Sequence, residues 1–126
     1  MDSQDKRNPI SFISSLSYAI SGVKIALRAE RNMRIHFISS IFVLIGSFYF
    51  SITKIEWLFI LFAISGMFAL ELVNTAIERV VDLMTEEYHP LAKQAKDLAA
   101  GAVLVYAVLS VAIGMIIFFP YILNLF

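Results

Sequence analysis

The chain has 126 residues, of which 60% are hydrophobic and 16% are charged, and its 10 basic and 10 acidic side chains cancel. A soluble domain of this size is nearer half apolar and a quarter charged, so the apolar excess needs a solvent other than water, and lipid is the simplest. The zero net charge gives no reason to expect a nucleic-acid partner, and the lack of cysteine excludes disulfides and thiolate metal sites.

The N-terminal part predicts a helix over about residues 9–28, with Asn8 as its N-cap and Pro9 at its first position. Apolar residues recur there at steps of three or four, with serines and basic residues between them. This spacing is typical of an amphipathic helix on a membrane surface. A helix that packs inside a soluble domain is the less favoured alternative, because the rest of the chain offers no soluble partner. Residues 1–9 contain no apolar run, so we expect no cleaved signal peptide there.

Three apolar stretches follow, over about residues 33–52, 56–82 and 92–119. Each is long enough to cross a bilayer, which takes about 20 helical residues. We expect a short turn between the first two, a polar loop before the third, and an end of the third span at Pro120, because proline disrupts a helix. The sequence therefore predicts an all-α integral membrane protein with one domain over residues 1–126, made of a surface helix and three transmembrane helices.

The basic residues are distributed unevenly among the segments outside the predicted spans. Only Lys54 lies near the turn between the first two spans, whereas several lie between the second and third. The group that precedes the first span is the largest and consists of Lys6, Arg7, Lys24, Arg28, Arg31 and Arg34. Because loops rich in lysine and arginine stay in the cytoplasm, we expect a multi-pass protein of the cell membrane. Its N-terminus and residues 79–97 should be cytoplasmic and its C-terminus outside.

Small residues repeat at helical spacing at the start of the third span, where Ala92, Ala95, Ala99 and Ala102 lie three or four positions apart. In lipid, small side chains allow two helices to approach closely, so this repeat predicts a helix–helix interface. Three thin helices also enclose a polar site poorly. We therefore expect a homo-oligomer, and the residues alone do not give its number of subunits.

A narrow polar stripe lies in the second predicted span after its apolar run ends at Leu70, and its members are Glu71, Asn74, Thr75, Glu78 and Asp82. Their spacing places all of them on one side of a helix, with about 10 Å along the axis between Glu71 and Glu78. Ionisable residues at a membrane boundary are costly unless they face a polar interior or a partner, so Glu71, Asn74 and Glu78 are candidate functional residues. The alternative, a solvated helix end that has left the bilayer, explains Asp82 equally well.

Further polar residues lie at the same predicted boundary. Glu30 precedes the first span and can supply, with Glu78, carboxylate oxygens to a hard cation such as magnesium. Lys96 and Asp97 open the third span, and a lysine there either meets a phosphate or is an ordinary cytoplasmic anchor. His36 stands near the membrane edge, and the two histidines lack the spacing of a zinc site. The residues alone allow magnesium-assisted phosphoryl transfer to a lipid head group, an ion-binding transporter, or a small membrane scaffold.

Residues 71–82, which read ELVNTAIERVVD, strongly resemble the prokaryotic diacylglycerol kinase family, as do residues 87–89 and 95–97 downstream. Residues 28–30 and 32–34 fit the same family, so the resemblance covers most of the chain. Members of this family are small three-span lipid kinases that form trimers with sites shared between neighbouring subunits. The resemblance therefore implies a homotrimeric lipid kinase that uses ATP and Mg²⁺.

The resemblance also implies roles for individual residues on the lipid side of the site. Glu71 matches the catalytic base, which takes the proton from the primary hydroxyl of the lipid. Glu30 and Glu78 match the magnesium-linked carboxylates that hold the nucleotide phosphates. Asn74 matches an active-site amide that supports this arrangement.

On the ATP side, the resemblance implies contacts from three parts of the chain. Lys96 and Asp97 match residues of the nucleotide site, with the lysine toward the phosphates. Tyr18 matches an aromatic residue on the surface helix. A loop that contacts the nucleotide is matched by three consecutive residues, Glu87, Tyr88 and His89.

Two departures bear on the lipid substrate. Members specific for diacylglycerol have a basic residue in the surface helix where this chain has Ser11, and the pattern over residues 16–19 differs as well. Residues 89–93 and 97–102 are instead similar to the Gram-positive branch, whose members resemble undecaprenol kinases acting on a polyprenol carrier used for the cell wall. We therefore expect undecaprenol as the acceptor, with diacylglycerol, which would yield phosphatidic acid, as the alternative.

Overall fold

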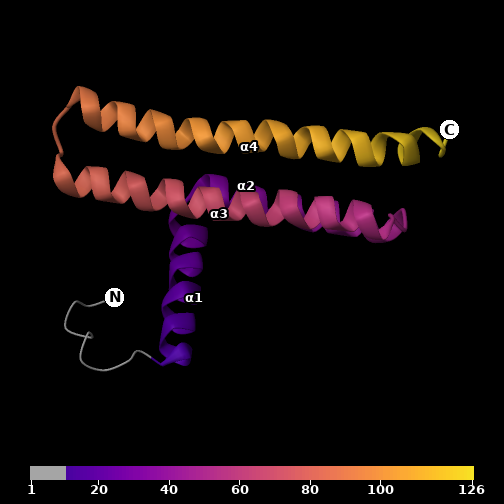
Figure 1. Cartoon of the computed structure of the whole chain (residues 1–126), viewed down its shortest axis with the longest axis horizontal. Helices are drawn as coiled ribbons and strands as arrows, with labels where there is room; N and C mark the ends of the chain where they lie inside the picture. Colours follow the sequence, from indigo (N-terminus) through magenta and orange to yellow (C-terminus); the bar gives the residue numbers. More distant parts are fainter. Residues whose placement is uncertain (1–10) are drawn as a thin grey trace.

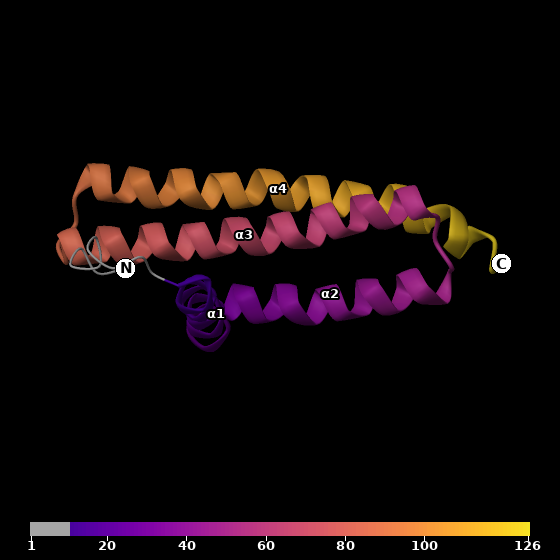
Figure 2. The ribbon, with the colours of Figure 1, turned by 60° about the horizontal axis from the view of Figure 1, so that its bottom comes forward.

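The computed structural model describes residues 11–126, which fold into four α-helices. In chain order these are α1 (Phe12–Ala29), α2 (Arg31–Tyr49), α3 (Lys54–Met84) and α4 (Pro90–Leu123). Helices α2, α3 and α4 run alongside one another, and α1 lies across their direction (Figures 1 and 2). The prediction of an all-α protein is confirmed for the described residues. The helix start predicted at Asn8 and Pro9 lies outside them.

Helix α1 begins after Ser11, whose hydroxyl oxygen accepts a hydrogen bond of 3.2 Å from the N–H of Ser14. This cap satisfies one of the N–H groups that the first turn of a helix leaves without a partner. Most of α1 is exposed, including the large apolar side chains of Phe12 and Ile13. An exposed apolar side on a helix that crosses the bundle direction is what a surface helix requires.

One residue, Glu30, separates α1 from α2, and its extended backbone (φ −106°, ψ 118°) makes the sharp corner between them. Arg34 clamps this corner, because its Nη1 donates to the carbonyl oxygens of Leu27 at 3.2 Å and Arg28 at 2.8 Å. Those carbonyls belong to the last turn of α1, where no further helical N–H is available. Ala26, buried in this turn, marks where α1 packs against the bundle.

The far end of the bundle is fastened by contacts between three elements. Thr53 and Glu56 cap α3 reciprocally, since the N–H of each bonds the side chain of the other, at 2.9 and 3.2 Å. Tyr121 of α4 donates its O–H to the same Oε1 of Glu56 at 2.6 Å. The main buried apolar cluster lies beside these contacts and consists of Ile52, Ile60 and Ile117. Helices α2, α3 and α4 are therefore held together at this end.

Helices α3 and α4 form the most extensive pair of the bundle and lie side by side along most of their length (Figures 1 and 2). Gly66 allows their close approach, because a Cβ at this position would lie 2.1 Å from the phenolic oxygen of Tyr106. That hydroxyl donates to the carbonyl oxygen of Phe62 at 2.5 Å. Ala95 and Ala99 of the small-residue repeat are half-buried on α4, whereas Ala102 is exposed.

The end predicted for the third span at Pro120 is wrong, because α4 continues through this residue to Leu123. Proline has no backbone N–H and therefore cannot donate a hydrogen bond to the preceding turn of a helix. Because Pro120 lies close to the end of α4, the missing hydrogen bond affects only the short stretch of helix that remains. The carbonyl oxygen of Pro120 is used, since it accepts from the N–H of Asn124 at 3.2 Å.

Two helices, α3 with 31 residues and α4 with 34, are long and apolar enough to cross a membrane. Helix α2, with 19 residues and two arginines in its first turn, is not among them. Large apolar side chains are exposed around the bundle, for example Phe42 on α2, Phe62 on α3 and Ile116 on α4, at 70%, 69% and 75%. Apolar surface of this extent is accommodated by lipid rather than water, so the fold supports association with a membrane.

Candidate active site

The polar stripe of α3 is buried where it begins at Glu71 and exposed where it ends at Asp82. Glu71 is 4% exposed and Thr75 6%, Asn74 and Glu78 are half-buried, and Asp82 is exposed. Burial of Glu71 follows from its position directly after the apolar run, where α2 packs alongside α3 (Figure 2). A buried carboxylate costs several kcal/mol unless polar groups compensate, so the contacts of Glu71 decide how it is accommodated.

The compensating group for Glu71 comes from the neighbouring helix α2. Nε2 of His36 lies 3.3 Å from Oε1 of Glu71, and the side chain of His36 is itself 26% exposed. Sequence reasoning placed His36 at the membrane edge but gave it no role, because a contact between residues 35 positions apart leaves no local pattern. The signal available was an ionisable side chain inside an apolar stretch, which in a membrane protein indicates function.

Asn74 and Glu78 face one another one helical turn apart. Nδ2 of Asn74 donates to Oε1 of Glu78 at 3.3 Å, while Oδ1 of Asn74 is buried without a hydrogen-bond partner among residues 11–126. Buried acceptors are rarely left unpaired in folded proteins, so this oxygen calls for a donor from beyond residues 11–126. The structure thus brings together these two predicted residues and leaves one of their oxygens available.

The donors of this region fit a magnesium ion in kind. Glu78 offers carboxylate oxygens, and Asn74 offers a buried amide oxygen without a partner among the described residues. Glu30 is half-buried at the α1–α2 corner, and its side chain makes no polar contact within residues 11–126. No three His, Asp or Glu side chains converge within those residues. Because Mg²⁺ is commonly held by one or two carboxylates together with substrate phosphates, a complete protein cluster is not required.

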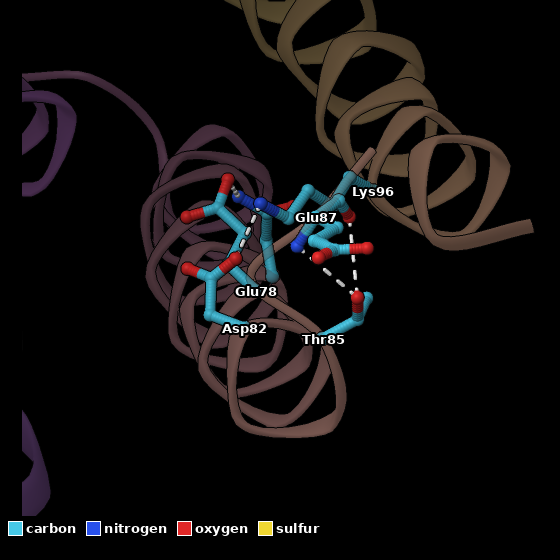
Figure 3. A network of polar contacts seen from close by, with 6 residues as sticks. Glu78, Asp82, Thr85, Glu87 and Lys96 are labelled. Carbon is cyan, nitrogen blue, oxygen red and sulfur yellow. Dashed lines mark hydrogen bonds and ion pairs between the residues drawn. The ribbon is translucent and has the colours of Figure 1, made fainter. Parts of the chain in front are cut away.

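Lys96 of α4 joins the polar stripe of α3 through Asp82, with 2.6 Å between Nζ and Oδ1. Figure 3 shows this pair beside Glu78 and above the loop that carries Thr85 and Glu87. Both partners are substantially exposed, so the ion pair contributes little to stability. Its consequence is positional, because it holds the lysine ammonium at the polar end of the bundle.

Asp97 lies apart from Lys96 although the two are adjacent in sequence. Its Oδ2 pairs with Nζ of Lys93 at 2.5 Å, one turn earlier on α4. Asp97 borders a different groove, which also contains Gly101 and Ala102. Consecutive helical residues do not face the same way, so the structure does not place Lys96 and Asp97 on one wall of a site within this chain.

A cavity of about 640 Å³ lies at the turn between α3 and α4. Thr85 shapes this turn, because its hydroxyl accepts from the N–H of Glu87 and donates to the carbonyl oxygen of the same residue, both at 3.2 Å. His89 then caps α4, with its Nδ1 accepting from the N–H of Leu91 at 3.1 Å. The predicted site residues that line the cavity are Glu87, Tyr88, His89 and Lys96.

Tyr18 lies on α1, away from that cavity lining, and is 52% exposed. It makes no hydrogen bond within the described part of the chain. The structure therefore brings together two sets of predicted residues. One is Glu71 with Asn74 and Glu78 along α3, and the other is Lys96 with residues 87–89. Glu30, Tyr18 and Asp97 stand outside both sets.

Comparisons with known proteins identify relatives of this chain. Residues 17–118 match the family described as "Prokaryotic diacylglycerol kinase". The chain is 50% identical over 121 residues to an undecaprenol kinase of Bacillus subtilis, covering 95% of this chain and 98% of that relative. It is 38% identical over 116 residues to a diacylglycerol kinase of Synechocystis sp., covering 91% and 66%. It is 26% identical over 99 residues to a diacylglycerol kinase of Escherichia coli, covering 79% and 81%.

An all-helical fold with long apolar helices, a buried carboxylate near their polar end, and relatives that are kinases together define a membrane-associated lipid kinase. The chain belongs to the prokaryotic diacylglycerol kinase family. The family and the enzyme class predicted from the sequence are confirmed. The transporter and scaffold alternatives have no support among these relatives.

Proposed function

We propose that this lipid kinase transfers the γ-phosphoryl group of ATP, with Mg²⁺, to the primary hydroxyl of undecaprenol. The product is undecaprenyl phosphate, the lipid carrier used for cell-wall synthesis. The observation that carries this proposal is the 50% identity, over nearly the whole of both chains, to a relative named undecaprenol kinase. The burial of Glu71 next to the apolar part of α3 supports it, because a lipid hydroxyl must be met at such a boundary.

Glu71 is the base in this proposal. Its carboxylate takes the proton of the lipid hydroxyl as the hydroxyl oxygen forms a bond to the γ-phosphorus, and the bond from phosphorus to the bridging oxygen of ADP breaks. Phosphoryl transfer needs chiefly positioning and charge neutralisation. Glu71 has a fixed place on a long helix, which is suited to positioning.

Glu78 and Glu30 are the proposed carboxylates for magnesium, with Asn74 supporting Glu78. These carboxylates would hold a bound Mg²⁺, which would supply positive charge to neutralise the phosphates. The protein's part is to present the carboxylates, and the hydrogen bond from Asn74 fixes one oxygen of Glu78 at 3.3 Å. Glu30 is attached to the bundle through the Arg34 clamp. The support for this assignment is the kind of donor present and the unpaired amide oxygen of Asn74.

The nucleotide is proposed to occupy the cavity at the α3–α4 turn. Lys96 lines this cavity with its ammonium held by Asp82, and a lysine acts on phosphate as a point charge. The exposed loop side chains of Glu87, Tyr88 and His89 border the same space. We propose Asp97 and Tyr18 as further nucleotide contacts.

The proposed arrangement in the membrane has three spans, formed by α2, α3 and α4, with α1 on the cytoplasmic surface. The N-terminus and residues 79–97 face the cytoplasm, and the C-terminus is outside. The three helices run alongside one another, which supports three crossings (Figure 2). We also propose a single domain and a homotrimer with sites shared between subunits. The separation of Tyr18 and Asp97 from the main cavity supports sharing, because a second subunit can bring these positions to it.

Diacylglycerol is the second candidate acceptor, because several relatives carry that name at lower identity. The test is to purify the protein in detergent and measure transfer of labelled γ-phosphate to undecaprenol and to diacylglycerol side by side. We expect faster transfer to undecaprenol. Faster transfer to diacylglycerol would overturn the proposed acceptor while leaving the kinase class intact.

The same assay tests the proposed base. Glu71→Gln removes the proton acceptor with little change in volume, and we expect kcat to fall roughly 100- to 10,000-fold, the usual contribution of a general base. The matched control is Glu56→Gln at the other end of α3, where the amide oxygen can still accept from Tyr121 and Thr53. Unchanged turnover in Glu71→Gln would remove this residue from the base role.

A further inference from the structure

We propose that His36 is a positioning residue for Glu71: its ring holds one carboxylate oxygen so that the other is free to meet the lipid hydroxyl. This inference rests on the role of Glu71 as base proposed above. It begins from a contact between two helices, in which Nε2 of His36 on α2 lies 3.3 Å from Oε1 of Glu71 on α3.

The carboxylate of Glu71 has few polar partners to choose from in the described part of the chain. The residue is 4% exposed, and His36 provides the only polar contact that its side chain makes within residues 11–126. A buried carboxylate without a polar partner is strongly unfavourable, so this contact selects among the orientations open to the side chain. With Oε1 engaged by the ring, Oε2 is the oxygen left to accept a proton.

The ring of His36 contacts Glu71 and also borders an apolar groove. It lines one end of a groove of about 260 Å³ between α2, α3 and α4, together with Ser40 and Met67. Ser40 bonds to the backbone of His36, donating its hydroxyl to the carbonyl oxygen at 2.6 Å, so it does not compete with Glu71 for Nε2 of the ring. The 3.3 Å contact is longer than a usual bond to a carboxylate, and catalytic contacts often tighten when substrate binds.

In this role His36 makes and breaks no bond to the substrate. Its loss leaves Glu71 in the same backbone position but free to rotate about its side-chain torsions. Misplacing a reacting group by about 1 Å can cost roughly 100-fold in rate. The effect should therefore fall on kcat with the lipid acceptor, while KM for ATP stays unchanged because the ATP cavity is lined by other residues.

Three substitutions separate positioning from packing. His36→Gln places an amide Nε2 the same number of bonds from the backbone as the ring Nε2, so it keeps a donor within reach of Glu71. His36→Asn carries the same amide on a shorter side chain that does not reach. His36→Leu keeps apolar bulk and has no donor. Thermal unfolding in detergent for each variant reports whether the fold survives.

We expect His36→Gln to retain kcat within a few-fold of the wild type. His36→Asn and His36→Leu should lose roughly 10- to 100-fold in kcat, with KM for ATP unchanged. If His36→Leu does not fold, the contrast between the amide variants decides. Equal kcat in His36→Gln and His36→Asn, or a wild-type kcat in His36→Leu, would overturn the positioning role.

A double substitution separates failure of this inference from failure of the proposed base. If His36 acts through Glu71, adding His36→Leu to Glu71→Gln should lower kcat no further. An additional loss of 10-fold or more would show that His36 acts independently, which overturns the inference. Full activity in Glu71→Gln alone would instead refute the base itself, and that result is read from the single variant.

Discussion

At the scale of single residues, neighbouring lysines on α4 have different surroundings. Nζ of Lys96 reaches across to Asp82 of α3, whereas Nζ of Lys93 turns back along α4 to Asp97. Only the first of these pairs links the two long helices. It holds a positive charge next to the polar stripe, at the cavity proposed for ATP. The side of α4 on which a lysine lies therefore decides whether its charge reaches the polar stripe of α3.

Replacing Lys96 should weaken the use of ATP. In Lys96→Gln we expect kcat/KM for ATP to fall roughly 10- to 100-fold, because a charge-assisted contact to phosphate is lost. Steady-state kinetics at varied ATP measure this effect. The control is Lys54→Gln, an exposed lysine at the opposite end of α3, which should behave as the wild type. An unchanged kcat/KM in Lys96→Gln would show that the phosphates bind elsewhere.

At the scale of elements, the α3–α4 pair depends on one point of close approach. Tyr106 packs over Gly66, and its hydroxyl reaches the carbonyl oxygen of Phe62. The aromatic ring fills the space in which any larger side chain at position 66 would lie. The pair positions Asp82 against Lys96, so the alignment of these helices also sets the geometry of the polar end.

Gly66→Ala should therefore destabilise the protein. The added Cβ would lie 2.1 Å from the phenolic oxygen of Tyr106, so the ring must move and give up its bond to Phe62. Overpacking of this kind costs about 1–3 kcal/mol, measurable as a lower midpoint of thermal unfolding in detergent.

Gly101→Ala is the matched control, because a Cβ there meets no atom within 4 Å among residues 11–126 apart from its own stretch of helix. It should be neutral or slightly stabilising, since alanine favours a helix over glycine. Combining Gly66→Ala with Tyr106→Leu should reduce the loss. Equal midpoints for Gly66→Ala and the wild type would contradict the steric explanation.

At the scale of the whole molecule, the proposed site residues are divided between separate places on one chain. Glu71 lies along α3 near α2, the cavity proposed for ATP lies at the α3–α4 turn, and Tyr18 lies on α1. In the proposed homotrimer with shared sites, a base from one subunit works with nucleotide contacts from its neighbour. The proposed assembly then explains why these residues lie apart within one chain, because each site combines residues of two subunits.

Mixing two impaired variants tests this sharing. Glu71→Gln and Lys96→Gln each spoil a different part of a site, so subunits exchanged between them should form some sites that are intact. We expect the mixture, after dissociation and reassembly in detergent, to regain part of the wild-type rate. Each variant treated alone in the same way is the control. No recovery despite confirmed exchange would place both residues of each site in the same subunit.

Much of this architecture could be predicted from the sequence, because long apolar runs and polar interruptions are local signals. The burial of Glu71 followed from its position after such a run. The continuation of α4 past Pro120 did not, since the cost of proline depends on how much helix follows. The contact of Glu71 with His36 was missed because it depends on which helices pack together.

The corner at Glu30 also determines how depth is set at the membrane. Only one residue joins two rigid helices there, and Arg34 grips the last turn of α1 from within α2. Such a short connection leaves no spare length of chain by which α1 could shift relative to the start of α2. In the proposed arrangement, movement of α1 on the membrane surface should leave the carboxylate of Glu30 at one depth. In the proposed membrane arrangement, the depth of α2 in the bilayer would therefore set the depth of Glu30, the proposed magnesium carboxylate.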